Sequence, residues 1–147
     1  MNSSMLCNSL RVLGDNRHSI HLQSIVDLLN DTLRVEVNNN TNYLEHIYDE
    51  FVTLIAKKCY LTNVDKDHAL FTQGRPYGAV HILFDGIAYE KSINPDDGSI
   101  IIDKNIKVGS VIGANVATSN MKEYPSTVSI ISENGAMCCS IPRYVFV

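Results

Sequence analysis

The chain has 147 residues, of which 45% are hydrophobic and 19% are charged. This length suits one domain, and the apolar content is sufficient for a buried core. The formal net charge is −4, and the 12 Lys and Arg residues are spread along the sequence, so we do not expect a nucleic-acid partner. No stretch approaches the roughly 18 apolar residues of a membrane span, and we expect a cytoplasmic protein.

The N-terminal part of the chain divides into two segments. Residues 1–17 are polar and lack a regular hydrophobic period, which predicts a flexible lead-in. Residues 18–58 are predicted to be helical. An apolar stripe marks the first helix of this segment: Ile20, Ile25, Val26, Leu28, Leu29 and Leu33. Asn38–Asn40 are expected to break that helix, because Asn side chains compete for backbone hydrogen bonds.

A second helix is predicted to end near residue 58. Asn42 and Glu45 have the spacing of a capping box at its start. Lys57 and Lys58 lie at its end, where the helix dipole favours cations. One face of this helix is apolar: Leu44, Ile47, Tyr48, Phe51, Val52 and Ile55. We interpret this face as facing the core, and the alternative is a helix that binds a partner.

The sequence over 59–147 has the pattern of short strands separated by turns. The candidate strands are residues 59–64, 69–73, 79–84, 86–92, 99–103, 106–112, 126–132 and 136–141. Eight short strands predict an antiparallel β-roll or jelly roll, so the expected fold class is α+β, mainly β, with N-terminal helices. Pro142 is placed to open a C-terminal helix that the end of the chain truncates.

The cysteines and histidines do not have the spacing of a catalytic or metal-binding motif. None of the four cysteines forms a C-x-x-C motif, and adjacent Cys138 and Cys139 on a strand would point to opposite faces. We interpret the cysteines as small buried hydrophobic residues in a reducing cytosol. His81 has no second histidine in its strand, so a cupin-type metal site is not expected. No G-x-S-x-G nucleophile elbow occurs, and we do not expect an enzyme.

The region around Leu70–Gly86 resembles the cyclic nucleotide-binding domain family. Members often read G-x-x-L-F-x-x-G-D-x-x-x-x-x-Y-x-I-L-x-G, and the corresponding residues here are Asp67, Leu70, Phe71, Gly74, Arg75, His81, Leu83 and Gly86. The family's later G-x-x-F-G-E motif corresponds to Gly109, Ile112, Gly113 and Ala114. The resemblance covers about residues 43–147 and implies the same β-roll. We expect Gly74 and Gly86 to supply backbone angles that other residues resist, and His81 to take the place of an aromatic side chain.

The resemblance also implies where a ligand would bind. In the family, the helix start after the second glycine of G-x-x-F-G-E faces the cyclic phosphate, the Glu binds the ribose, and an Arg in R-x-A-T-V binds the phosphate. Here Gly113 is kept, Ala114 replaces the Glu, and Tyr124 stands at the Arg position. Ser126 and Thr127 complete the second motif. The resemblance thus implies a degenerate site that has lost cAMP and cGMP, with no cofactor.

Two functions follow from this resemblance. The first is a regulatory or interaction module of a larger signalling protein, such as a Rap guanine-nucleotide exchange factor, that docks on neighbouring domains or a protein partner. The second is a genuine receptor for cAMP, cGMP or another small ligand with altered chemistry. Its candidate ligand-binding residues are Gly113, Ala114, Asn115, Lys122, Tyr124, Ser126 and Thr127.

Overall fold

The computed structural model describes residues 3–12, 14–40, 45–114 and 121–146. Helices occupy the first part of the chain: α1 (Ser3–Arg11), the 3-10 helix η1 (Gly14–Asn16), α2 (Ser19–Asn40) and α3 (Glu45–Lys58). The strands follow: β1 (Tyr60–Val64), β2 (Ala69–Phe71), β3 (Ala79–Asp85), β4 (Ala88–Ile93), β5 (Ile100–Ile106), β6 (Val111–Ile112), β7 (Thr127–Ile130) and β8 (Ala136–Pro142). A 3-10 turn, η2 (Arg143–Phe146), comes after β8.

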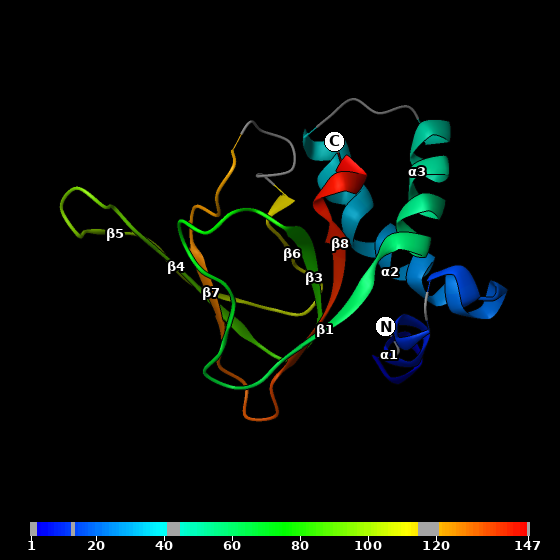
Figure 1. The fold of residues 1–147 in the computed structure, drawn as a ribbon, viewed down its shortest axis with the longest axis horizontal. Coiled ribbons are helices and arrows are strands. Elements are labelled where there is room, and N and C mark those ends of the chain that lie inside the picture. Colours follow the sequence, from blue (N-terminus) through cyan, green and yellow to red (C-terminus); the bar gives the residue numbers. More distant parts are fainter. Residues whose placement is uncertain (1–2, 13, 41–44, 115–120, 147) are drawn as a thin grey trace.

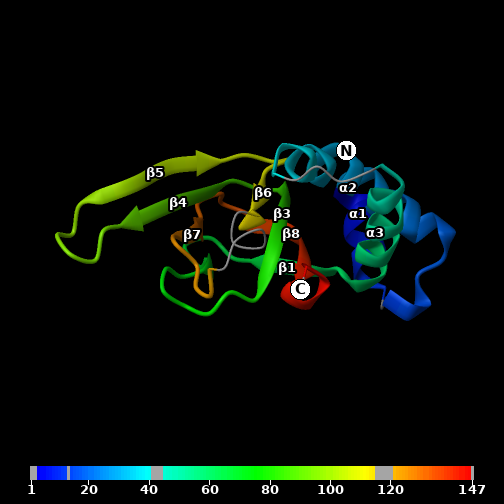
Figure 2. The ribbon, with the colours of Figure 1, turned by 90° about the horizontal axis from the view of Figure 1, so that it is seen from above.

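The strands form two four-stranded antiparallel sheets that face each other as a roll. Their orders are β1-β8-β3-β6 and β2-β7-β4-β5. The three α-helices lie on the side of the first sheet, and the β4–β5 hairpin projects on the opposite side (Figures 1 and 2). Each of the eight predicted strands overlaps an observed one, so the prediction of a mainly β α+β roll with N-terminal helices is confirmed.

Strand β8 is buried on both faces, which explains its apolar sequence. Successive side chains of a strand point to opposite faces. Ser140 points into the roll, where its hydroxyl contacts His81 of β3. Cys139 points the other way, toward Cys59 at the end of α3. The predicted opposite orientation of Cys138 and Cys139 agrees with this arrangement, and both side chains are fully buried.

Helix α1 corrects the prediction for residues 1–17. Ser3–Arg11 are helical, and Leu6, Cys7 and Leu10 are buried in the core. The prediction of an irregular lead-in is therefore wrong for these residues. The helix is short, and its apolar residues are separated by polar ones, so the sequence pattern is too brief to identify it.

Helix α2 follows its predicted stripe with two differences. Ile25, Leu28 and Leu29 are buried, as expected, whereas Ile20 is 66% exposed in the first turn. Asn38–Asn40 belong to the last turn of α2 and do not precede its end. The low helix propensity of Asn is thus tolerated at the terminus, where fewer backbone bonds depend on it.

The predictions for α3 and for the C-terminus have mixed outcomes. Val52 and Ile55 are buried, which confirms the core-facing interpretation for that part of α3. Asn42, the predicted capping residue, lies outside the described residues. Pro142 ends β8 and does not open an α-helix, and within the described residues the 3-10 turn η2 follows it.

Several turns of the roll contain residues with left-handed backbone angles. Gly86 has a φ of 99°, and a Cβ built there would lie 2.6 Å from the Gly135 carbonyl oxygen, so any side chain would clash. Asp67 has a φ of 69°, a conformation that Asp tolerates better than most residues. Gly74, with a φ of 85°, also meets the expectation for a special backbone angle.

Candidate functional site

Tyr124, at the position where the family has its phosphate-binding Arg, is buried inside the roll. Its hydroxyl donates to the Ala79 carbonyl oxygen at 3.0 Å and accepts from the Ala79 and Gly78 amides at 3.1 and 3.2 Å. One hydroxyl thereby satisfies the Gly78 amide and both the amide and the carbonyl of Ala79 at the start of β3. A hydroxyl that makes these three bonds has no capacity left for a ligand.

The ring of Tyr124 is enclosed by other aromatic rings. It stacks on Phe71 with a centroid separation of 3.8 Å and an interplanar angle of 8°. Tyr77 meets it edge-on at 5.4 Å, and the Arg143 guanidinium lies 5.7 Å from the Tyr77 centroid. A Cβ on Gly113 would lie 3.9 Å from both tyrosine rings, so the aromatic cluster reaches the glycine of the motif. The space beside Gly113 on this side is therefore filled by protein.

His81 continues the packed aromatic cluster toward β8. Its ring lies 5.9 Å from Phe71 in a stacked arrangement. Its Nδ1 is 2.6 Å from Ser140 Oγ, which in turn shares a hydrogen bond with Thr62 Oγ1 at 2.6 Å. Burial lowers the pKa of His81 to about 4, because desolvation penalises the imidazolium. His81 is thus a neutral core residue, in keeping with the aromatic position that it replaces.

A cavity of about 580 Å³ lies on the other side of Gly113, between α2 and the β4–β5 strands. Gly113 and Ala114 line it, together with Glu90 of β4. Glu90 accepts a hydrogen bond of 2.6 Å from Ser126 and forms an ion pair of 3.6 Å with Lys104. The Glu90 side chain is only 18% exposed. The wall of this cavity therefore carries a sequestered carboxylate next to the motif glycine.

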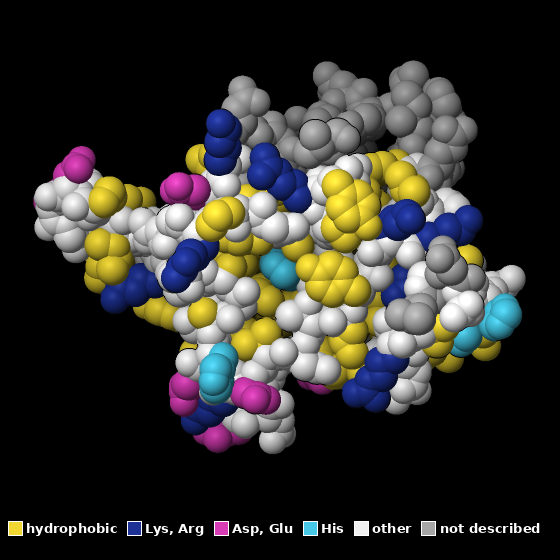
Figure 3. All heavy atoms as spheres, viewed as in Figure 1, with side chains coloured by type: hydrophobic (Ala, Val, Ile, Leu, Met, Phe, Trp, Pro, Cys, Tyr) yellow, Lys and Arg dark blue, Asp and Glu magenta, His cyan; other side chains and the backbone are white. Residues whose placement is uncertain are grey.

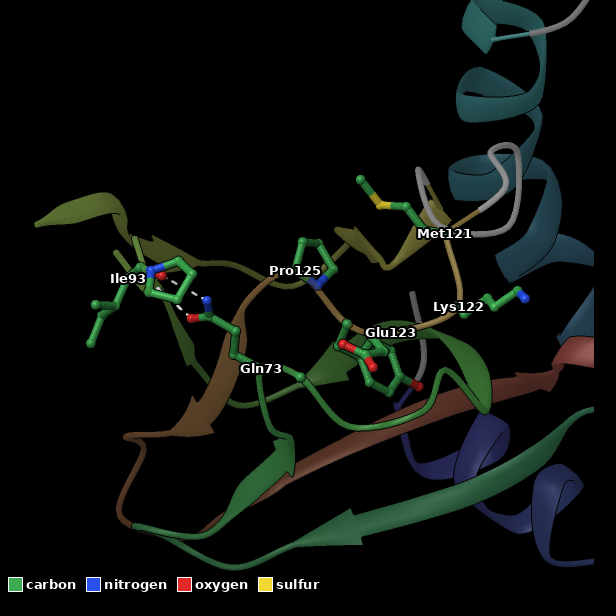
Figure 4. A pocket seen from close by; sticks show the side chains of 9 residues that line it. Gln73, Ile93, Met121, Lys122, Glu123 and Pro125 are labelled. Atoms are coloured by element: carbon green, nitrogen blue, oxygen red, sulfur yellow. Dashed lines mark hydrogen bonds between the residues drawn. The ribbon is translucent and has the colours of Figure 1, made fainter. Parts of the chain in front are cut away.

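Lys122 and Tyr124 line a different hollow, of about 780 Å³, on the outer side of the segment 121–125. Figure 4 shows Gln73 bridging to Ile93 across this hollow, while Lys122 extends away from both. The bridge consists of two hydrogen bonds of 2.7 and 3.0 Å between the Gln73 amide and the Ile93 backbone. Thr127 Oγ1 accepts from the Gln73 backbone amide at 2.9 Å.

The predicted ligand-binding residues thus do not surround one described space. Gly113 and Ala114 line the cavity with Glu90, whereas Lys122 and Tyr124 line the outer hollow. Ser126 and Thr127 are engaged by other residues of the chain. Asn115 lies outside the described residues.

Sequence analysis missed Glu90 and Tyr77. Glu90 lies between Ala88 and Ser92, which are both buried, and the two-residue period of a strand would have placed its side chain on the inner face. Tyr77 gave no such signal, because it follows the turn at residues 74–76 and lies outside any strand. Its buried hydroxyl has no hydrogen-bond partner among the described residues, and burial raises its pKa.

The surface and helices show few further features. Lys and Arg side chains are dispersed over the face drawn in Figure 3. None of the described helices combines the length and apolar character needed to cross a bilayer. Within the described residues, no three His, Cys, Asp or Glu side chains come together as a metal site would require.

Comparison with known proteins identifies the fold. No sequence profile of a known family matches the chain, and no curated protein sequence does. Solved structures do match. The regulatory domain of Toxoplasma gondii PKA, crystallised with cAMP, has a TM-score of 0.67 at 14% identity over 89% of this chain and 45% of that chain. An inferred cAMP-binding regulatory protein from Silicibacter pomeroyi gives 0.64 at 21% identity, over 85% and 51%.

The likeness extends to regulators of transcription. The sensor domain of DNR from Pseudomonas aeruginosa has a TM-score of 0.55 at 16% identity, over 77% of this chain and 75% of that domain. The chain spans about half the length of the two proteins named before it. Its fold is that of the cyclic nucleotide-binding regulatory domains, and the resemblance noted in the sequence is confirmed at the level of the fold.

Proposed function

We propose that this chain is a regulatory or interaction module that keeps the cyclic nucleotide-binding fold and has lost binding of cAMP and cGMP. The observation that carries this proposal is the buried Tyr124. Its hydroxyl is bonded to Gly78 and Ala79, and its ring is stacked on Phe71. It provides no positive charge for a phosphate, and hydrogen bonds to charged groups are the stronger ones.

A nucleotide could occupy the space of the Tyr124 side chain only by displacing that side chain. Moving the phenol would leave the Gly78 and Ala79 backbone groups without their partner, and each unsatisfied buried group costs about 1–3 kcal/mol. A micromolar ligand has only about −8.2 kcal/mol of binding free energy. Displacement of Tyr124 would therefore consume a large part of the affinity of an ordinary second-messenger site.

The cavity on the other side of Gly113 is also unfavourable for an anion. Glu90 places a carboxylate on its wall, and Ala114 supplies no acceptor for a ribose hydroxyl. Like charges in a partly buried site repel each other. The nearby Lys104 is 64% exposed and already paired with Glu90, so it offsets this repulsion little.

Isothermal titration calorimetry with cAMP and cGMP tests the proposal directly. We expect no saturable heat of binding at nucleotide concentrations up to about 100 μM, and no shift of the melting temperature in parallel thermal denaturation experiments. The Toxoplasma gondii PKA regulatory domain, which crystallises with cAMP, is the positive control. Saturable binding of either nucleotide at micromolar concentration would refute the loss of binding.

The remaining parts of the proposal concern context. Regulatory and sensor proteins share this fold, which supports a non-enzymatic role. We place the chain in the cytoplasm, in a larger signalling protein of the Rap exchange-factor kind, where it docks on neighbouring domains or a protein partner. Nucleic acid is not a proposed partner, because the net charge is −4.

One observation favours the second candidate, a receptor with altered chemistry. The cavity of about 580 Å³ beside Gly113 and Ala114 has the size of a small-molecule site. Native mass spectrometry of the purified protein would reveal a retained ligand. We expect the mass of the bare chain; an additional small-molecule mass that Glu90→Gln abolishes would favour the receptor.

A further inference from the structure

A groove lies between α1 and α2, on the side of the molecule opposite the β4–β5 hairpin (Figures 1 and 2). It consists of two hollows of about 590 and 330 Å³, and Met5 of α1 and Ile20 of α2 line both of them. Leu6 and Leu28, each 2% exposed, form the floor of the larger hollow. The two helices therefore pack together beneath the groove, which is open above this floor.

The groove exposes two large apolar side chains. Ile20 is 66% exposed and Met5 is 47% exposed, although both helices bury other apolar residues in the core. Single exposed apolar residues are common on protein surfaces. Two of them on neighbouring helices, around the same hollows, form a patch, and covering such a patch with the apolar side chains of a partner is favourable. The groove is thus a part of the helical surface that is suited to docking.

One rim of the groove is acidic. Asp27 and Asp31 of α2 line the larger hollow, and the described residues that line the two hollows include no Lys or Arg. The two aspartates are four residues apart, so their side chains lie one helical turn apart on the same face of α2. Gln23 donates to Asp27 at 2.8 Å, and no ion pair joins either carboxylate to another described residue. The rim therefore favours a partner that carries two cations at the same spacing.

The shape of the groove suits a helix better than a strand. The stretch from Ile20 to Asp31 covers about three helical turns, or about 16 Å. The backbone groups along this stretch are bonded within α2, so an added strand would find no main-chain partners there. A helix, by contrast, presents apolar side chains and cations along one face without needing such partners.

We propose that the groove between α1 and α2 docks a basic amphipathic helix of a protein partner. Apolar side chains of this helix cover Met5 and Ile20, and Lys or Arg side chains one turn apart contact Asp27 and Asp31. The inference rests on the proposed role of the chain as an interaction module, for which it supplies a docking surface and the chemistry of the partner.

Fluorescence anisotropy with a designed peptide tests whether the groove binds such a helix. The labelled probe has about 15 residues, the length at which isolated helices begin to form. Its one face consists of Leu, flanked by Lys residues spaced four apart, and a second peptide has Glu in place of every Lys. We expect saturable binding of the Lys peptide to the 147-residue chain and no binding of the Glu peptide. Absence of saturable binding of the Lys peptide up to about 100 μM chain overturns the proposal.

Two double variants decide whether the peptide responds to the groove or to the net charge. Asp27→Asn combined with Asp31→Asn should weaken binding of the Lys peptide about fivefold, because two exposed ion pairs are lost. Asp96→Asn combined with Asp97→Asn removes the same two charges at the turn of the β4–β5 hairpin, where both side chains are exposed, and should leave the affinity unchanged. Equal weakening by the two double variants would mean that only the net charge attracts the peptide, and this result overturns the proposal.

A second pair of variants tests the apolar contact. Ile20→Gln should weaken binding of the Lys peptide about tenfold, because the isoleucine is no longer available for burial against the partner. Ile101→Gln is the matched control, since Ile101 of β5 is exposed to nearly the same extent, 63% against 66%, and it should not change the affinity. An unchanged affinity of Ile20→Gln overturns the proposal. Calorimetry with cAMP and cGMP decides the loss of nucleotide binding independently, so the failure of one inference is distinguishable from the failure of the other.

Discussion

Tyr124 and Phe71 stack inside the roll with ring centroids 3.8 Å apart and planes 8° from parallel. The backbone reinforces this pairing: the Gly74 amide donates to the Tyr124 carbonyl, and the Tyr124 amide donates to the Arg75 carbonyl, each at 2.9 Å. The segment before β7 is thus held to the turn after β2 by backbone hydrogen bonds and by side-chain stacking together. The aromatic rings of Phe71, Tyr77 and Tyr124 thus fill the interior of the roll on this side of Gly113.

Tyr124→Phe should destabilise the fold although it keeps the ring. The variant retains the stack on Phe71 and loses the bonds to Gly78 and Ala79. Backbone groups left unsatisfied in a buried site predict a loss of about 1–3 kcal/mol in the free energy of unfolding. Urea denaturation followed by circular dichroism measures this loss.

Tyr144→Phe is the matched control for that experiment. Tyr144 is 66% exposed, so the same removal of a hydroxyl should change the free energy of unfolding by less than about 0.5 kcal/mol. Equal stability of Tyr124→Phe and the wild type would contradict the assigned role of the phenol.

Stability should depend on pH through His81. The pKa of His81 falls from its ordinary value of 6.5 to about 4 in the folded protein, so the unfolded chain binds more protons between these values. Stability from this residue is complete above pH 6.5 and is lost as the pH falls toward 4. The difference corresponds to about 3 kcal/mol.

His81→Gln isolates this contribution, because Gln can still bond to Ser140 and does not titrate. We expect the stability difference between wild type and variant to decrease by about 3 kcal/mol from about pH 7 to about pH 4. Other titrating groups cancel in the difference. Parallel pH profiles of the two proteins would show that His81 is not held neutral by burial.

The strands were predictable because their signals are local. Alternating apolar residues and turn residues mark each strand, and the unusual backbone angles at Gly74 and Gly86 follow from the glycines themselves. The replacement of the family's phosphate-binding Arg by Tyr124 could also be read from the sequence, since it concerns a single residue. The role that Tyr124 takes instead was not predictable, since its hydrogen bonds reach Gly78 and Ala79 at the start of β3, which are distant in the sequence.

Features that depend on long-range contacts escaped the sequence pattern. Helix α1 was missed because its few apolar residues become meaningful only when Arg17 joins its end to α3. The strand period indicates that Glu90 points inward, but its partner Ser126, just before β7, is 36 residues away in the sequence, so the bond between them was missed. In each case a polar side chain is buried because a distant residue satisfies it, and sequence spacing does not record such partners.

Gly86→Ala should be much more damaging than Gly98→Ala. Both glycines have positive φ, 99° and 74°, so both substitutions incur about 1–2 kcal/mol of backbone strain. Only at Gly86 would the new Cβ also collide with backbone, 2.6 Å from the Gly135 carbonyl oxygen, whereas nothing lies within 4 Å at Gly98. Overpacking adds about 1–3 kcal/mol. Similar melting temperatures of the two variants would disprove the close approach.

Arg17→Lys should weaken the attachment of α1 more than an ordinary loss of one contact. The planar guanidinium serves four carbonyls at the ends of two helices, and a single ammonium cannot reproduce this geometry. We expect a loss of about 2–4 kcal/mol in the free energy of unfolding. Hydrogen exchange should accelerate in Ser3–Arg11 more than in the strands. Arg75→Lys, at an exposed arginine, should change stability by less than about 0.5 kcal/mol. Unchanged exchange in α1 would mean that Arg17 does not hold this helix in place.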